Sequence, residues 1–188
     1  MDNRRNSNLS TTGAASSRWV TRERPKIDRI ACPWLIRRFI DAHAEFHYVP
    51  ADRVLAAAVE LGATPYDIPG VEFSHSGDLC SFDAFLAKYE LTDPALHRVA
   101  VIVRGADTSR LDLTPQSAGL YAISLGLSAI FADDHQMLEH GMVVYDALYA
   151  WCSKLQGETH NWPPAGYPAT DLAAATKRTT QEGTNGKT

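Results

Sequence analysis

Two cysteines stand where helices are expected to begin. Pro33 suits the first turn of a helix, and a helix starting there would hold Cys32 at its positively polarised end, where a thiolate is favoured. Arg29 and Arg37 would add positive charge, which suits a nucleophile, a redox thiol, a soft-metal ligand or an oxyanion site. The alternative is a helix that begins at Asp28 and is capped by it, with Cys32 buried, as free cysteines commonly are.

Cys80 repeats this arrangement, because it precedes Ser81, which we expect to cap a helix over Phe82–Tyr89. The third cysteine, Cys152, lies in an apolar helical stripe and is expected in the core. The sequence contains neither a CxxC nor an HExxH motif, so cysteine and histidine spacing alone specifies no metal site.

Glu72 and His75 are the candidate metal ligands. They offer one oxygen and one nitrogen donor, and Asp78 could add a second oxygen. Such groups also arise by chance, so the alternative is a solvated loop. If the site is real, we expect a divalent cation, whose identity the donor set does not fix.

A second polar segment runs from Arg104 to Thr108. The guanidinium fork of Arg104 suits oxyanions, and Asp107 could orient it or bind a cation; the alternative is a surface ion pair. We therefore expect an anion clamp of Arg29, Arg37 and Arg104, with Cys32 and Asp107 as candidate catalytic residues. No GxGxxG, Walker or GxSxG motif is present, so common nucleotide and hydrolase sites have no support.

Hydrophobic periodicity and capping residues predict the elements that must position these side chains. In the first half we expect four extended segments, over Arg18–Arg22, Glu45–Val49, Thr64–Asp67 and Val71–His75. We also expect two helices there, over Cys32–Asp41 and over Arg53–Leu61, the second capped by Asp52. The second half predicts helices over Phe82–Tyr89, from Asp93-Pro94 to Gly105, over Pro115–Ile130, and from Asp133, which with Gln136 resembles a capping box. A buried strand over Val99–Val103 is the alternative there. The predicted class is α+β, a small sheet from the N-terminal half packed against a helix-rich C-terminal half.

Composition predicts one ordered domain over residues 18–169 between polar tails at 1–17 and 170–188, the first of them basic. The net charge of −4 argues against broad nucleic-acid binding. No signal peptide or membrane-length apolar run is found, so we expect a cytoplasmic protein. Three cysteines, an odd number in a reducing compartment, predict free thiols and no disulfide framework. A Trp- and Pro-rich segment, residues 161–164, could dock on a second copy.

Four stretches resemble the C-terminal domain of the chromate-resistance protein ChrB: KIDRIACPWLIRRFIDAHAEFHYVP, GATPYDIPGVEFSHSGDLCSFDAFLAKYELTDPAL, VRGADT and VYDALYAWC. The likeness covers about Arg18 to Cys152. Its motif positions are Asp28, Arg29, Cys32, Trp34, Arg37, Glu72, His75, Cys80, Asp83, Arg104 and Asp107. The resemblance implies an association with chromate efflux. Longer members carry an extra N-terminal region linked to chromate-responsive regulation, or a rhodanese-like sulfurtransferase domain. This chain has only a short basic tail there, which weakens any expectation that it controls transcription or transfers sulfur itself.

Three hypotheses follow. The first is a cytosolic protein of the chromate-stress response that binds a metal ion, chromate, a related oxyanion or another small molecule; whether it is an enzyme stays open. The second is a regulatory module that binds a partner protein or DNA through the basic N-terminal arm. The third is a structural domain without a small-molecule site.

Overall fold

The sheet is built from the first half of the chain. The structure is a computed structural model and describes residues 17–158. Strands β1 (Arg18–Arg22), β2 (Glu45–Val49) and β3 (Thr64–Pro65) pair in parallel in the order β2-β1-β3, so β1 is central. The predicted strands over Arg18–Arg22 and Glu45–Val49 are confirmed. The predicted extended segment Val71–His75 forms no strand, and only Phe73 makes an isolated bridge there.

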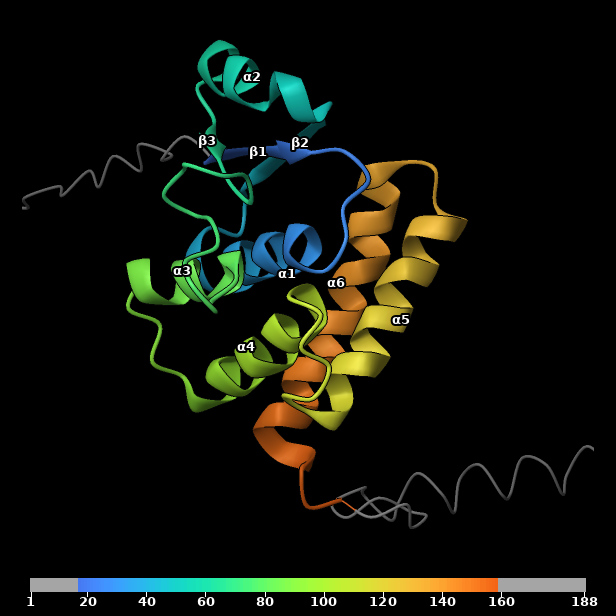
Figure 1. The fold of residues 1–188 in the computed structure, drawn as a ribbon. Coiled ribbons are helices and arrows are strands. Elements are labelled where there is room, and N and C mark those ends of the chain that lie inside the picture. Colours follow the sequence, from blue (N-terminus) through green and yellow to red (C-terminus); the bar gives the residue numbers. More distant parts are fainter. Residues whose placement is uncertain (1–16, 159–188) are drawn as a thin grey trace, which may run out of the picture. The chain divides into compact units, whose positions relative to one another are not determined.

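The alternating side chains of β1 divide the apolar interior into two clusters. Val20 packs with α2 (Val54–Leu61) in a small cluster, and Trp19 belongs to the main core, which includes α1 (Asp28–Leu35). Figure 1 accordingly shows α2 on one side of the sheet and α1 on the other. A 3₁₀ turn over Ala51–Arg53 precedes α2, without the side-chain cap that was predicted from Asp52.

Helix α1 begins at Asp28, so Pro33 lies inside the helix and not in its first turn. A proline there removes the N–H that would bond to the carbonyl of Arg29. The hydroxyl of Tyr48 donates to that carbonyl instead, at 3.1 Å. The chain continues as the π-helical turn η1 (Ile36–Ile40). The prediction that Cys32 opens the helix is wrong, and the alternative with a buried Cys32 is confirmed.

The second half is helical, as predicted: α3 (Ser81–Lys88), α4 (Pro94–Asp107), α5 (Pro115–Ile130), α6 (Asp134–Ala150) and the turn η3 (Trp151–Leu155). Asp93 and Asp133 cap α4 and α6 through the amides of Ala95 and Gln136. The N-cap of α3 is Cys80, so the predicted cap at Ser81 is wrong by one residue.

Gly105 does not end its helix, because α4 continues to Asp107, and the alternative of a strand over Val99–Val103 is wrong. The glycine serves close packing: a Cβ there would lie 2.3 Å from Oγ of Ser117 on α5. Ser117 is buried and donates to the carbonyl of Ile102.

The described fold is α+β, with a three-stranded parallel sheet in the first half and mainly helices in the second, as predicted. This unit ends at Ser153. Apart from Ser17, the two predicted tails lie outside the described residues. So do the segment 161–164 and the end of the predicted domain, residues 159–169. Within residues 17–158, no helix has the length and apolarity that crossing a membrane requires.

Candidate metal centre

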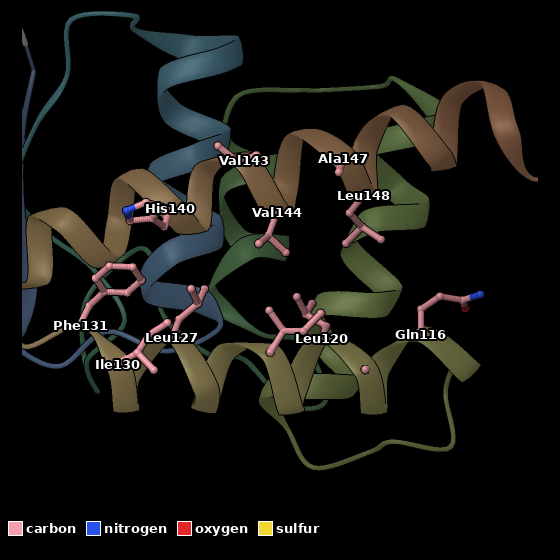
Figure 2. Close-up of a pocket in the computed structure, with 12 residues that line it drawn as sticks. Gln116, Leu120, Leu127, Ile130, Phe131, His140, Val143, Val144, Ala147 and Leu148 are labelled. Carbon is pink, nitrogen blue, oxygen red and sulfur yellow. The ribbon is translucent and has the colours of Figure 1, made fainter. Parts of the chain in front are cut away.

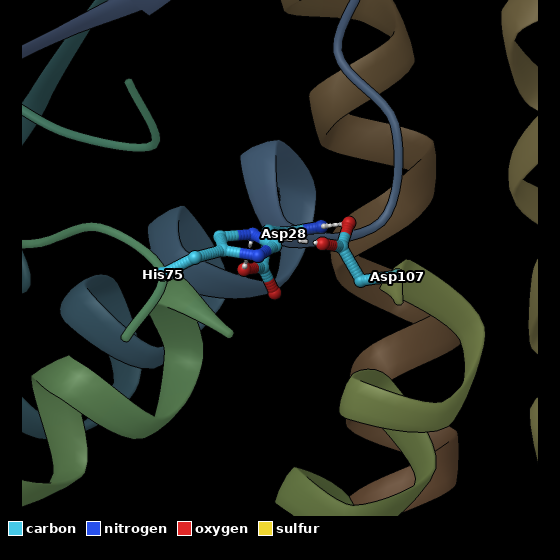
Figure 3. Close-up of side chains that lie close together, drawn as sticks. All are labelled: Asp28, His75 and Asp107. Atoms are coloured by element: carbon cyan, nitrogen blue, oxygen red, sulfur yellow. Dashed lines mark hydrogen bonds and ion pairs between the residues drawn. The ribbon is translucent and has the colours of Figure 1, made fainter. Parts of the chain in front are cut away.

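Two aspartates follow the carboxyl ends of neighbouring parallel strands. Asp28 opens α1 after β1, and Asp67 comes two residues after β3. Ligand sites in parallel sheets lie at this edge, because the loops that leave adjacent strands meet there. His75, from the loop before α3, and Asp107, the last residue of α4, reach the same point (Figure 3).

The imidazole of His75 is surrounded by carboxylates. Its Nε2 lies 3.0 Å from Oδ2 of Asp107 and 3.6 Å from Oδ2 of Asp28. Oδ1 of Asp67 is 3.5 Å from the same nitrogen. Two ligands bonded to one ion at about 2.1 Å are about 3.0 Å apart at a right angle and about 3.4 Å apart at the tetrahedral angle. Asp28, His75 and Asp107 each offer a ligand atom, all within 4.8 Å of one another.

Outer hydrogen bonds orient these carboxylates. Ser81 donates its backbone N–H to Oδ2 of Asp28 at 2.6 Å and its hydroxyl to Oδ1 of Asp67 at 2.9 Å. The alternative in which Asp28 caps its own helix is wrong on this point, because its carboxylate accepts from the first residue of α3. Arg22 and Arg29 both pair with Oδ2 of Asp67, at 2.8 Å and 3.3 Å. Because Ser81 binds Oδ1 and two arginines bind Oδ2, Asp67 is better suited to support the centre than to be a metal ligand.

The backbone beside the site is strained and clamped. Ile27, immediately before Asp28, has φ 38°, which is unfavourable for a β-branched residue. Its N–H donates to Oγ of Ser124 on α5, and its carbonyl accepts from the hydroxyl of Tyr145 on α6, each at 3.1 Å. Such strain persists only where surrounding contacts impose it, and here those contacts fix where the Asp28 side chain begins.

Burial and mutual repulsion shape the ionisation of the cluster. Asp28 is completely buried, and its Oδ1 has no hydrogen-bond partner within residues 17–158. Burial raises the pKa of Asp28 and, together with the charges of Asp28 and Asp67, raises that of Asp107 to about 7. Hydrogen bonds to Asp28 and Asp67 raise the pKa of His75 to about 10. Burial also acts against ionisation of Asp67, but His75 and Arg22 outweigh it and lower the pKa of Asp67.

The centre therefore concentrates negative charge around one nitrogen donor. A protonated imidazole offsets part of that charge. A cation could take over this role once His75 loses its proton. One imidazole with two carboxylates suits divalent first-row ions such as Mn²⁺, Fe²⁺ or Zn²⁺. A cavity of about 230 Å³ next to the imidazole, lined in part by Arg22, Ser74 and His75, gives access from solvent.

The structure brings together two of the predicted site residues, His75 and Asp107, and leaves Glu72 outside the cluster. The Glu72 carboxylate is exposed and pairs with Lys88 at 2.5 Å. Asp78, the proposed additional oxygen donor, is also exposed.

The three arginines of the predicted anion clamp are bound by separate partners. Arg29 pairs with Asp67 at the edge of the centre. Arg37 lies over the ring of Phe46 and donates to a backbone carbonyl. Arg104 forms a two-pronged bond to Asp83, at 2.6 and 2.9 Å, and does not pair with Asp107.

Cys32 and Cys80 are buried. Burial is the main cause that raises the pKa of both thiols, and the nearby Asp28 charge is the second. This environment favours neutral thiols, even at Cys80, which lies at the N-terminus of α3. Cys152 is buried as well, so its predicted place in the core is confirmed.

Asp28 and Asp67 were not among the residues predicted for the site. The available signal for Asp67 was its position as the last residue of the expected extended segment Thr64–Asp67. For Asp28 the signal was its acidic side chain at the start of an apolar helix. The alternative interpretation of that helix took Asp28 for its cap. Neither signal identifies a partner, since the partners come from α3, α4 and a loop.

Comparison with known proteins gives the family. Residues 19–152 match the family described as "ChrB, C-terminal domain". The chain is 33% identical over 132 residues to "Protein ChrB" of Cupriavidus metallidurans (strain CH34), a match that covers 70% of this chain and 39% of that protein. The chain thus spans about two fifths of the length of this curated relative. No solved structure matches the chain significantly. The chain belongs to the family of ChrB C-terminal domains, a family associated with chromate resistance.

Proposed function

We propose that this chromate-resistance-associated domain binds a divalent first-row metal ion through Asp28, His75 and Asp107. The observation that carries the proposal is the convergence of their ligand atoms within 4.8 Å from three separate elements. The buried, unpartnered Oδ1 of Asp28 supports it, because leaving such an oxygen without a partner costs stability unless a ligand repays it. Ser81 would provide the outer hydrogen bonds that metal-binding carboxylates usually receive.

Metal content of the purified protein tests this proposal. The full chain is expressed and purified without chelator, and bound metals are quantified by mass spectrometry in four forms: wild type, His75→Ala, Glu72→Ala and His43→Ala. We expect near-stoichiometric metal in the wild type, in Glu72→Ala and in the exposed-histidine control His43→Ala, and loss in His75→Ala. Equal metal in wild type and His75→Ala would refute the site. Loss in both His75→Ala and Glu72→Ala would instead support a Glu72–His75 pair.

An oxyanion is the second candidate ligand, favoured by one observation. The Nε of Arg22 is buried without a hydrogen-bond partner in the described chain, and Arg22 lines the cavity beside His75. A small tetrahedral anion there could contact both the guanidinium and a metal on His75. A thermal-shift panel of phosphate, sulfate, molybdate and chromate, with and without Mn²⁺, tests this. Metal-dependent stabilisation that is lost in Arg22→Ala supports it, and no shift with any anion rejects it.

A further inference from the structure

Helix α5 carries two serines inward and several large apolar side chains outward. Over Pro115–Ile130 it has no charged residue. Its serines at 117 and 124 are buried and bond to the core, through the Ile102 carbonyl and the Ile27 amide. Ile123 and Ile130, by contrast, are 48% and 72% exposed. A helix that is apolar on its outer side is normally covered by another element.

The exposed face extends across α6. A groove of about 770 Å³ runs between the two helices, and Figure 2 shows Leu120 and Leu127 of α5 facing Val144 and Leu148 of α6 across it. On its rim, Val143 of α6 is 66% exposed. Among residues 17–158, the only ionisable side chain that lines the groove is His140, and this ring stacks on Phe131 at a centroid distance of 4.4 Å.

We propose that this α5–α6 face is the interface of a homodimer, in which two copies pack as a four-helix bundle. A pair of helices of this length presents a face of about 24 by 20 Å, on the order of 500 Å² in projection and more along its ridges. Stable dimers bury roughly 600–1,000 Å² per partner, so the whole face, ridges included, is needed to reach the lower end of that range.

The size and chemistry of the face favour a second copy over other occupants. An extended peptide or a small apolar ligand would fill the groove, which Ile123 and Val143 line, but would not cover the exposed small residues of α5 outside it, such as Ala122 and Gly126. An acidic or basic partner would find no complementary charge on α5. A second copy offers a two-helix face of the same length and apolarity, and two-fold packing of identical faces is the commonest assembly of soluble proteins. The glycines 119 and 126 have open space around them, which leaves room for a neighbouring helix to approach closely.

Sedimentation velocity of the full chain over a hundredfold concentration range tests the proposal. We expect twice the chain mass of 20.6 kDa for the wild type. Ile123→Glu and Val143→Glu should shift the protein to monomer by weakening dimerisation at least tenfold. The matched control is Val59→Glu, on α2, where Val59 is 85% exposed and away from this face; it should remain dimeric.

Hydrogen exchange of the wild type supplies a readout without substitutions: protection of α5 should increase with protein concentration. A wild type that is monomeric throughout, with concentration-independent exchange in α5, would overturn the dimer and leave the groove to another occupant. A dimer that survives both glutamate variants would also overturn it. Metal content is independent of either outcome, so failure here is distinguishable from failure of the metal proposal.

Discussion

The Nε2 atom of His75 lies 3.0 Å from Oδ2 of Asp107, although one side chain comes from a loop and the other from the last residue of α4. The fully buried Asp28 carboxylate completes the group from the first residue of α1. Their placement follows from the parallel sheet, from the proline-containing helix that Tyr48 stabilises, and from the contacts of Ile27 with α5 and α6.

Replacing Asp28 by asparagine should separate stability from metal binding. The amide keeps an acceptor for the Ser81 N–H but removes a buried charge whose Oδ1 lacks a partner. We expect the free energy of unfolding of the metal-free protein at pH 8 to change by no more than ~1 kcal/mol, because removing the buried charge offsets the weakened pairing with the protonated His75. Metal affinity should fall by at least ~100-fold. Urea unfolding in EDTA and calorimetric titration measure the two effects, and a destabilised variant with full affinity would contradict the role assigned to Asp28.

Stability of the metal-free protein should decrease as the pH rises from 7 to 10. The pKa of His75 is about 10 in the folded state against an ordinary value near 6.5, so the folded state retains a proton that the unfolded state has lost. The stabilisation is complete below about pH 6.5 and disappears as the pH passes 10. Since the side chain is 41% exposed, solvent screening limits the effect to ~1–2 kcal/mol. Unfolding in EDTA should show a flatter pH profile for His75→Gln and an unchanged one for His43→Gln.

Metal binding should release protons. At pH 7.5 a cation must displace the proton of His75, whose pKa is about 10, whereas Asp107, with a pKa of about 7, is already mostly ionised. We expect release of about one proton per ion and an affinity that rises about tenfold per pH unit between pH 7 and 9. Titration calorimetry in two buffers of different ionisation enthalpy measures the number released. An affinity that does not change with pH would argue against His75 as a ligand.

Much of this fold could be predicted from local signals. Asp93-Pro94, Thr114-Pro115 and Asp133 mark helix starts, and the alternating apolar side chains of β1 mark a strand buried on both faces. Errors arose where a tertiary contact replaced a local one. Pro33 is tolerated inside α1 because a tyrosine from β2 supplies the missing donor, and Gly105 serves packing and not helix termination.

The candidate centre was harder to predict than the fold. His75 and Asp107 could be chosen by residue type, but their separation in sequence carries no information about contact. Glu72 was favoured because it is near His75 in sequence, whereas in the structure it pairs with Lys88 on α3. The ligand role proposed for Asp28 depends on burial and on the neighbouring α3, neither of which the sequence displays.

The close contact of α4 with α5 gives a stability prediction away from the centre. Gly105→Ala places a methyl group against Oγ of Ser117 and should lower the free energy of unfolding by about 1–3 kcal/mol. Adding Ser117→Gly makes room, so the double variant should lose less than the sum of the two single variants. Urea unfolding of all four proteins measures the coupling. Additive effects would mean that the two positions do not contact each other.

The most direct test of the central claim is anomalous diffraction from crystals of the full chain grown with Mn²⁺. The account predicts one strong anomalous peak within about 2.0–2.3 Å of Nε2 of His75 and of carboxylate oxygens of Asp28 and Asp107. A peak held by Glu72 without Asp28, or no peak near His75 at saturating Mn²⁺, would contradict it.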